Sequence, residues 1–471
     1  MIMKIIVFGT GVYWNNRKKY VLDSCDIVCF LDNNPDKWNN EIDGKMIVNP
    51  QSIYQYQFDY IVIMCKDEKS VSAQLIALGV SKDKILNWQQ LRKTYLNDFW
   101  LSYSECREKV YNIVMFSTTL SYNGGTLAAI YAVKALMSKG YKVLLCAEDC
   151  NDKLLNELLK DRLEIMLAPG IPYAINSKLK NIISSCEVVL INVLQMLPIA
   201  CQLNGKKPVL WWIHEPQELY QPTLQQYPEY LERQLYDQEN IVAVSNIAQN
   251  NFNTMFFEAI NQNMPYGIPD LYNGKNEVNG ESEKVTFAII GGVTEQKAQD
   301  VFLEAIDLLS EKDKSCSQFY IIGSYGTDDY STKICEEAGK YDNIIMTGNL
   351  TRSEMEEIYP QLDVVVCPSR EETMSIVLTE AMMYKKACIG SDSTGMADYI
   401  EDGVNGFVCR TEDPIDLCEK MRYFIHHPES IQKMGVEGRK AYEEYFTMEK
   451  FSDRLCEMLK ETIDRFNEDT K

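Results

Sequence analysis

Two glutamates eight positions apart, Glu372 and Glu380, are the residues of this chain with the clearest chemical potential. Glu372 stands just before an apolar run of helical period, and Glu380 falls one to two turns inside it, so both carboxylates can face one surface. First-turn N–H groups, about Thr373 to Val377, can receive phosphate oxygens, while a carboxylate accepts hydrogen bonds from sugar hydroxyls. This combination suits a nucleotide sugar. On an ordinary amphipathic helix both glutamates would simply be solvated.

Several motifs around these residues resemble one known family. The run CPSREETMSIVLTEAMM at 367–383, with Gly395 and EDGVNGFV at 401–408, resembles the C-terminal signature of family 4 glycosyltransferases, which have the GT-B fold. Glu372-x7-Glu380 fits the E-x7-E element of that signature. Upstream, GGVTEQKAQD at 291–300 resembles the family's donor-phosphate loop, and NGGT at 123–126 resembles its N-domain glycine loop. The resemblance covers roughly residues 110 to 450.

By this resemblance the chain is expected to be a retaining glycosyltransferase, a hexosyl- or related transferase, acting between a nucleoside-diphosphate sugar and an acceptor hydroxyl. Glu372 would orient the transferred sugar and stabilise charge at its ring, and Glu380 would accept hydrogen bonds from the ribose. Fixed donors around the departing diphosphate should contribute most to catalysis. Lys297, at the start of a helix, and the N–H groups near Ser375 and Ile376 are expected to supply them.

No metal or other cofactor is expected, since the chain has no H-E-x-x-H motif and no Asp-x-Asp in the donor loops. Retaining hydrolases use a carboxylate as the nucleophile. In the family that this chain resembles, front-side attack assisted by the leaving phosphate is the usual proposal, so Glu372 is not assigned that role.

Other candidate residues lie further upstream, between residues 110 and 275. Gly124 and Gly125 sit between a strand and a long helix, where missing side chains let the backbone approach a ligand; a tight turn is the alternative. His214 directly follows the apolar strand LWWI, and strand C-termini of α/β domains gather ligand groups. The family commonly carries histidine here, near the donor sugar, so a catalytic role is expected, with a structural hydrogen bond as the alternative.

The chain departs from the family pattern at several positions. An arginine often found five residues before Lys297 is replaced by Gly292, and Arg370 is a candidate to compensate for it. Thr373 and Ser375 stand where the signature has glycines, which leaves the donor sugar open. These departures support an alternative function, a catalytically silent GT-B subunit that binds or stabilises a partner transferase.

Composition narrows the class of protein. The length of 471 residues suits about three domains, and fifteen scattered cysteines without a C-x-x-C pair indicate reduced thiols. The net charge of −21 is concentrated in residues 276–471, which carry 21 basic and 40 acidic residues, a balance of −19. No basic stripe is present, so a nucleic-acid partner is not expected. The longest apolar stretch, near Val188 to Leu203, is shorter than the roughly 20 residues of a membrane span.

Strands alternating with helices predict an α/β fold, the GT-B architecture of two Rossmann-like domains preceded by a third Rossmann-like domain. We expect residues 97–110 to be a partly helical connector and residues 273–283 to be an interdomain linker. The expected domains are an accessory domain over 1–98, an acceptor domain over 110–275, a nucleotide-sugar donor domain over 284–447, and a C-terminal helix over 448–471 that packs back across the acceptor domain or contacts a membrane surface.

The first unit resembles N-terminal Rossmann-like domains of bacterial sugar-modifying enzymes. Gly9-x-Gly11 after a first strand, with Asp32 after a second, is the Rossmann arrangement for a nucleotide ribose. Trp14 occupies the place of the third glycine and would crowd the helix or the pyrophosphate. A nucleotide ligand and a purely structural or docking role both stay open, and an epimerase or oxidoreductase run by this unit is a further alternative.

Family resemblance also suggests partners and location. We expect a nucleotide sugar as donor and a glycan, lipid-linked glycan or protein as acceptor, in bacterial polysaccharide or glycoconjugate synthesis. The expected location is cytoplasmic, with peripheral contact at the inner face of the membrane as an option. The donor sugar, its base, the acceptor and the oligomeric state are left open.

Overall fold

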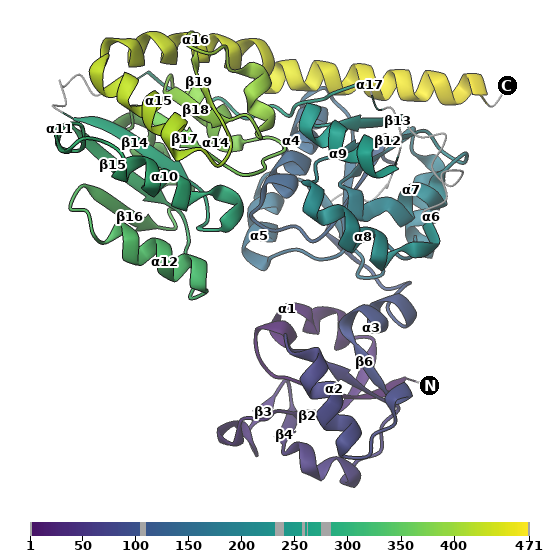
Figure 1. Cartoon of the computed structure of the whole chain (residues 1–471). Helices are drawn as coiled ribbons and strands as arrows, with labels where there is room; N and C mark the ends of the chain where they lie inside the picture. Colours follow the sequence, from purple (N-terminus) through teal and green to yellow (C-terminus); the bar gives the residue numbers. More distant parts are fainter. Residues whose placement is uncertain are drawn as a thin grey trace.

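The computed structural model describes residues 2–103, 110–230, 240–256, 260, 262–274 and 284–469. Among these residues the strands form three sheets, one in each of three α/β domains (Figure 1). Apolar residues such as those of Val364–Cys367 fill the strands in continuous runs, as expected for parallel strands buried on both faces. The predicted α/β fold class is therefore confirmed.

The first domain is built on a sheet of order β3-β4-β2-β1-β5-β6, parallel except for β3. The strands are β1 (Met3–Phe8), β2 (Cys25–Leu31), β3 (Glu41–Ile42), β4 (Lys45–Val48), β5 (Tyr60–Ile63) and β6 (Ile85–Asn87). The helices are α1 (Val12–Val21), α2 (Glu68–Ala77) and α3 (Trp88–Thr94).

The second domain has a sheet of order β13-β12-β11-β8-β9-β10-β7, in which β7 alone is antiparallel to its neighbour among the described strands. Its strands are β7 (Leu101–Tyr103), β8 (Ile113–Ser117), β9 (Val143–Ala147), β10 (Glu164–Leu167), β11 (Val188–Asn192), β12 (Val209–Ile213) and β13 (Asn240–Ala243). Its helices are α4 (Gly124–Ser138), α5 (Asp152–Lys160), α6 (Ser177–Ser185), α7 (Leu197–Leu203), α8 (Tyr220–Gln226) and α9 (Asn246–Phe256).

Strand β7 corrects the expectation of a partly helical connector. Its residues pair with β10 and extend the second sheet by one edge strand, with Ile165 opposite Tyr103. Three residues are too few to show a period, so the local pattern could not reveal this pairing. Residues 104–109 of the connector lie outside the described residues.

The third domain carries the entirely parallel sheet β16-β15-β14-β17-β18-β19. Its strands are β14 (Val285–Ile290), β15 (Ser317–Ile322), β16 (Ile344–Gly348), β17 (Val364–Cys367), β18 (Ala387–Ser391) and β19 (Gly406–Cys409). Its helices are α10 (Gln299–Asp307), α11 (Glu311–Ser315), α12 (Asp329–Ala338), α13 (Arg352–Ile358), α14 (Ile376–Met383), α15 (Pro414–His426) and α16 (Glu429–Tyr445).

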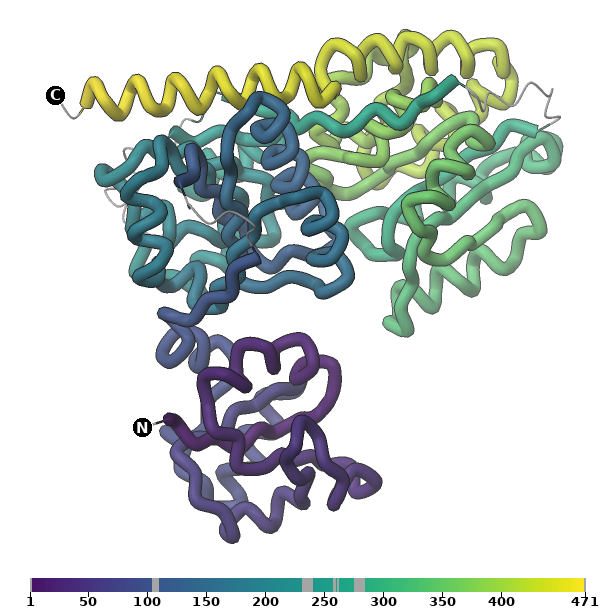
Figure 2. Tube along the Cα trace, turned by 180° about the vertical axis from the view of Figure 1, so that it is seen from behind, coloured from purple at the N-terminus to yellow at the C-terminus, as the bar shows by residue number. Residues whose placement is uncertain are grey.

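The chain crosses between the second and third domains in two neighbouring places. Residues 262–274 run from the second sheet toward the third domain and pair with the start of the last helix, through a bridge of Ile268 with Thr447 (Figure 2). Helix α17 (Met448–Asp469) then returns across the second domain, where the ring of Phe451 lies 5.6 Å from that of Trp212 and Lys139 pairs with Asp453. The predicted linker residues 275–283 lie outside the described residues.

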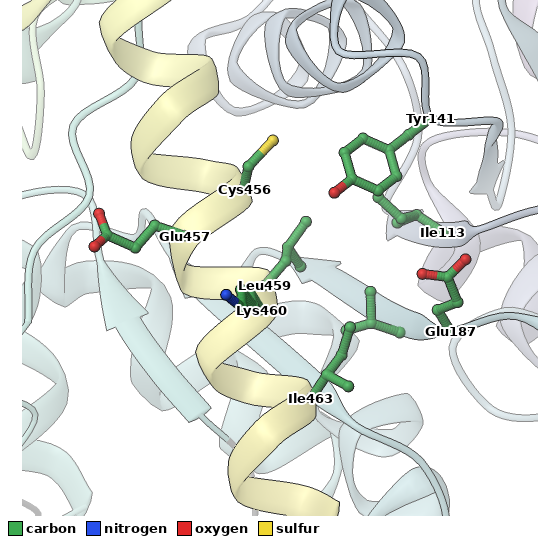
Figure 3. Close-up of a pocket in the computed structure, with 9 residues that line it drawn as sticks. Ile113, Tyr141, Glu187, Cys456, Glu457, Leu459, Lys460 and Ile463 are labelled. Carbon is green, nitrogen blue, oxygen red and sulfur yellow. The ribbon is translucent and has the colours of Figure 1, made fainter.

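A surface groove of about 500 Å³ lies beside α17, and its lining includes none of the candidate site residues (Figure 3). Ile113 and Val188, at the starts of β8 and β11, line it together with Cys456 and Ile463 of the helix. Ligand groups in such domains gather at the opposite, carboxyl ends of the strands. We therefore do not place the active site in this groove.

Within the described ranges, no helix has both the length and the apolar character needed to pass through a bilayer. The cysteines described by the structure are free thiols, and most of them are buried.

Candidate active site

Lys297 and Glu372 form an ion pair in the third domain, although 75 residues separate them in the chain. The Nζ atom of Lys297 donates to Oε2 of Glu372, and Ser369 Oγ donates to the same oxygen at 3.3 Å. Burial opposes the charge of Lys297, but the Glu372 carboxylate outweighs this effect, so the pKa of Lys297 is raised. The carboxylate of Glu372 and the ammonium group of Lys297 thus meet at one point.

Lys297 does not begin a helix, contrary to the sequence prediction. It ends a short 3-10 turn, Glu295–Lys297, and α10 starts two residues later. Ala298 between them adopts φ 57° and ψ 43°, the left-handed region that glycine adopts most easily. The alanine thus holds a turn that glycine would form with less strain.

Glu372 is held in place by its own backbone. Its N–H donates to the carbonyl of Ser393 at 2.9 Å, and its carbonyl accepts the N–H of Gly395 at 2.8 Å. A Cβ atom at Gly395 would lie 2.0 Å from the carbonyl oxygen of Thr373, so a larger residue there would displace this loop. The glycine in the signature therefore serves to position Glu372.

Glu380 is buried in α14 and already has two partners. Its Oε1 atom pairs with the guanidinium of Arg352, and its Oε2 atom accepts the hydroxyl of Tyr359 at 2.8 Å. Only 5% of Glu380 is exposed. A carboxylate offers about four lone-pair sites. With respect to the described residues, two acceptor sites of Glu380 therefore stay available for a hydroxylated ligand such as a ribose.

The start of α14 lies next to both glutamates. Ser375 is the N-cap residue, and its hydroxyl accepts the N–H of Leu378 at 3.4 Å. The N–H groups of Ile376 and Val377 belong to the first turn, where no helical carbonyl can reach them. These amides and the positive end of the helix dipole favour an anion at this place, as the sequence suggested.

Arg370 is engaged by protein groups. Its guanidinium makes two hydrogen bonds to Asp300, at 3.1 and 2.9 Å, and its Nε atom donates to Glu412 at 2.7 Å. It also donates to the carbonyl of Glu295 at 2.6 Å. Phosphate binding by Arg370 in compensation for Gly292 stays a prediction, and it would require the guanidinium to leave at least one of these carboxylates.

His214 lies at the carboxyl end of β12 in the second domain. Burial lowers the pKa of His214 to about 3, so its imidazole is neutral at physiological pH. Its ring lies 4.2 Å from that of Trp212, and its Nε2 atom has no hydrogen-bond partner among the described residues. An unpaired buried nitrogen is costly unless something binds it. The unpaired Nε2 atom therefore does not support the alternative in which His214 only makes a structural hydrogen bond.

The loop that carries Glu372 also joins the two domains. Thr373 Oγ1 donates to the carbonyl of His214 at 2.7 Å, which places the histidine beside this loop. The neighbouring Glu371 accepts the N–H of Gln217 and the side-chain amide of Asn251, both at 2.7 Å. The structure thus brings His214, Thr373 and Glu372 together from separate domains.

The glycine loop ends at the start of α4. Asn123 caps this helix by accepting the N–H of Thr126 at 2.9 Å. A Cβ atom at Gly124 would meet nothing within 4 Å, whereas one at Gly125 would lie 3.5 Å from Val193. Open space over Gly124 is compatible with the close approach of a ligand, which stays a prediction.

In the first domain, protein side chains contact the residues that the Rossmann arrangement would use to bind a nucleotide. Asp32 accepts Lys37 Nζ at 2.8 Å and the hydroxyl of Thr10. Trp14 is buried in the core, 5.0 Å from the ring of Phe30, and donates to Asp43 at 2.7 Å. The tryptophan is thus accommodated inside the domain, and the acid expected to bind a ribose is already paired.

Sequence reasoning missed three partners in this region: Arg352, Tyr359 and Glu371. The first two lie 28 and 21 residues before Glu380, and no motif connects them to it. No sequence motif indicated that Glu371, next to Glu372, contacts the second domain. Within the part of the chain that the structure describes, no group of three or more His, Cys, Asp or Glu side chains is arranged to hold a metal ion.

Three family models match successive parts of the chain. Residues 1–86 match a "C2185-like, N-terminal" model, residues 109–241 match "Glycosyl-transferase family 4", and residues 274–441 match "Glycosyl transferases group 1". The two glycosyltransferase matches together cover more than half of the chain and coincide with the second and third domains.

Curated relatives agree with these matches. An uncharacterized glycosyltransferase of Methanocaldococcus jannaschii, MJ1178, is 25% identical over 72% of this chain and 95% of that protein. The putative glycosyltransferase EpsD of Bacillus subtilis is 29% identical over 33% of this chain and 41% of its own length. The alpha-D-kanosaminyltransferase of Streptomyces kanamyceticus is 24% identical over 39% of this chain. The chain spans less than half the length of EpsD and of the kanosaminyltransferase, which it covers by 41% and 47%.

Solved structures show the same fold. HepE of Anabaena, crystallised with UDP and glucose, aligns with 74% of this chain and 99% of its own at a TM-score of 0.62 and 16% identity. WaaG, a glycosyltransferase involved in lipopolysaccharide biosynthesis, aligns with 73% of this chain at a TM-score of 0.51. With its two matched domains and the geometry at their junction, the chain belongs to the family 4 glycosyltransferases of the GT-B fold, and it carries a further Rossmann-like domain in front of them.

Proposed function

We propose that this protein is a retaining glycosyltransferase that moves a sugar from a nucleoside diphosphate to an acceptor hydroxyl, in bacterial polysaccharide or glycoconjugate synthesis. The observation that carries the proposal is the Lys297–Glu372 ion pair beside the start of α14, at the junction with the second domain. A cation, unpaired amides and a carboxylate are the groups that a diphosphate and a sugar require. Acceptors of the expected kind are glycans, lipid-linked glycans or proteins.

The reaction breaks the bond between the anomeric carbon and the diphosphate oxygen. Lys297 and the first-turn amides of Ile376 and Val377 would stabilise the negative charge that develops on the diphosphate. The acceptor oxygen forms its bond on the same face of the sugar, and its proton passes to the leaving phosphate. No covalent intermediate on Glu372 is required.

Glu372 would act on the sugar. Its carboxylate is fixed by Lys297 and Ser369, so it can hold a sugar hydroxyl and stabilise positive charge at the ring without moving far. His214 would contribute its neutral Nε2 atom to the same sugar, because the Thr373 contact places the histidine next to this loop. Glu380 would hold the ribose with its two unused acceptor sites.

The proposal is tested with purified full-length protein and a panel of nucleotide sugars. Thermal shift identifies the donor, because a ligand that binds the folded state raises the melting temperature. Diphosphate release with candidate glycan acceptors then measures turnover, and NMR of the product's anomeric proton reports the stereochemistry. Inversion at the anomeric carbon would contradict the retaining assignment.

One observation favours the silent-subunit alternative. Arg370 is bound to Asp300 and Glu412, so its guanidinium would have to leave one of them to replace the cation lost at Gly292. A donor that binds but is never turned over with any acceptor, alone or after Glu372→Gln, would support this alternative. Turnover that Glu372→Gln abolishes and Glu336→Gln, an exposed acid of the same domain, leaves intact would exclude it.

A further inference from the structure

The first domain contacts the second in several places, among them the carboxylate of Asp149, which follows β9. Tyr20, at the end of α1, donates its hydroxyl to Asp149 Oδ1 at 2.5 Å, and Lys19 Nζ lies 3.1 Å from the same oxygen. The N–H of Cys150 donates to it as well, at 2.8 Å. Lys19 reaches further to Asp152 and to the carbonyl of Cys150. Figure 1 shows α1 and α3 as the parts of the first domain nearest to the second.

The contact is reinforced by a buried ion pair next to Asp149. Arg92 of α3 pairs with Glu148, and their side chains are 8% and 14% exposed. Tyr20 itself is fully buried, with its ring edge-on to that of Phe99. Charged groups are buried in this way only when each is paired, because an unpaired partner would bear the full cost of desolvation. The two domains are therefore held in one relative position at Glu148 and Asp149.

Asp149 also holds the glycine loop, through its main chain. The N–H of Leu120 donates to the carbonyl of Asp149 at 2.8 Å, and the N–H of Asn151 donates to the carbonyl of Leu120 at 3.0 Å. Leu120 is fully buried. Three residues later Asn123 caps α4, and Gly124 opens that helix. One short strand-like bridge therefore connects the domain contact to the glycine loop.

We infer that the first domain is a brace for the glycine loop, residues 120–125, and that Tyr20 is a positioning residue for it. Tyr20 fixes the side chain of Asp149, whose carbonyl fixes Leu120, and Leu120 sets where Gly124 and Gly125 begin α4. A loop held from outside loses little conformational entropy when a ligand binds it. The inference rests on the proposed function in giving this loop a role in transfer.

The test compares Tyr20→Phe with Tyr111→Phe in the full-length protein. Tyr111 is also buried in this part of the chain and donates its hydroxyl to Glu164, at the start of β10 and away from the glycine loop. Both variants lose one tyrosine–carboxylate hydrogen bond, so a general loss of stability is common to both. Hydrogen–deuterium exchange of peptides that span residues 118–126 should be faster in Tyr20→Phe and unchanged in Tyr111→Phe.

Turnover provides the second measurement. Loss of a hydrogen bond to a charged group should lower kcat/KM for the donor by on the order of tenfold in Tyr20→Phe. Asp149→Asn should act in the same direction, since it removes the charge that Lys19 and Tyr20 share. Tyr111→Phe should keep wild-type kinetics. Equal exchange in the two tyrosine variants overturns the brace, and faster exchange with unchanged kinetics overturns its role in transfer.

The inference about Tyr20 and the proposed function can fail independently of each other. If the wild-type protein turns over no nucleotide sugar, the proposed function fails, while the exchange of residues 118–126 still decides whether Tyr20 holds the glycine loop. If turnover is present and Tyr20→Phe matches Tyr111→Phe in both measurements, the inference fails and the proposed function stands.

Discussion

Removal of the Glu372 charge should separate donor binding from turnover. In the structure, Glu372 holds Lys297, the cation assigned to the diphosphate. A nucleoside diphosphate must therefore compete with Glu372 for this cation. Glu372→Gln keeps the shape of the side chain, removes the competing charge and leaves Lys297 free for phosphate.

The magnitude follows from how exposed the pair is. The side chains of Lys297 and Glu372 are 26% and 15% exposed, so the pair is neither fully exposed nor fully buried. A surface ion pair contributes up to about 1 kcal/mol, and the disruption of a buried one costs about 3–5 kcal/mol. An intermediate value of about 1.5 kcal/mol corresponds to roughly tenfold in Kd. Binding of a nucleoside diphosphate without its sugar should tighten by up to this factor.

Turnover should change in the opposite direction. Glu372 is assigned to the positive charge of the sugar ring, and loss of one such electrostatic group lowers kcat by about 10²–10³. Isothermal titration with the best nucleoside diphosphate of the panel measures the first effect, and diphosphate release at saturating donor measures the second. Glu336→Gln should change neither quantity. Weaker diphosphate binding together with intact turnover would refute the assigned roles.

Three further predictions follow from the same geometry. Lys297→Ala should raise the Kd of the nucleoside diphosphate about thirtyfold, because a charge-assisted hydrogen bond worth about 2 kcal/mol is lost; titration calorimetry that returns the wild-type Kd would contradict this. Glu380→Ala leaves the hydroxyl of Tyr359 buried without its partner, so denaturant unfolding should show about 2 kcal/mol less stability and donor binding should weaken. Glu357→Ala, which removes an exposed carboxylate on α13, should leave both unchanged. Burial lowers the pKa of His214 from 6.5 to about 3, so its contribution to stability is present above pH 6.5 and is lost as the pH falls toward 3. The free energy of unfolding of the wild-type protein should therefore drop more steeply across this range than that of His214→Asn. Parallel curves for the two proteins would count against a buried neutral imidazole.

Much of the fold could be predicted because it depends on local periodicity. The strands Val188–Asn192 and Val285–Ile290 and the helix from Met448 follow from apolar runs and helical spacing alone. Helix geometry likewise places Glu372 before α14 and Glu380 within it. The short strand Leu101–Tyr103 could not be found in this way, because its strand character comes from pairing with β10.

The partners of the site residues were decided by the tertiary structure. Lys297 meets Glu372 across 75 residues, Arg352 and Tyr359 reach Glu380 from another helix and turn, and Arg370 is taken by Asp300. Each contact depends on the packing of the third domain, which brings segments from distant parts of the chain together.

The sequence by itself determined which residue types stand at the start of α14 and that an extra Rossmann-like unit precedes the catalytic domains. The tertiary structure decided which charges are paired and where that extra unit binds, through Tyr20 and Asp149. The physical reason is that a periodic pattern reports only which face of an element is buried. Hydrogen bonds and ion pairs between distant residues arise once those faces have packed together.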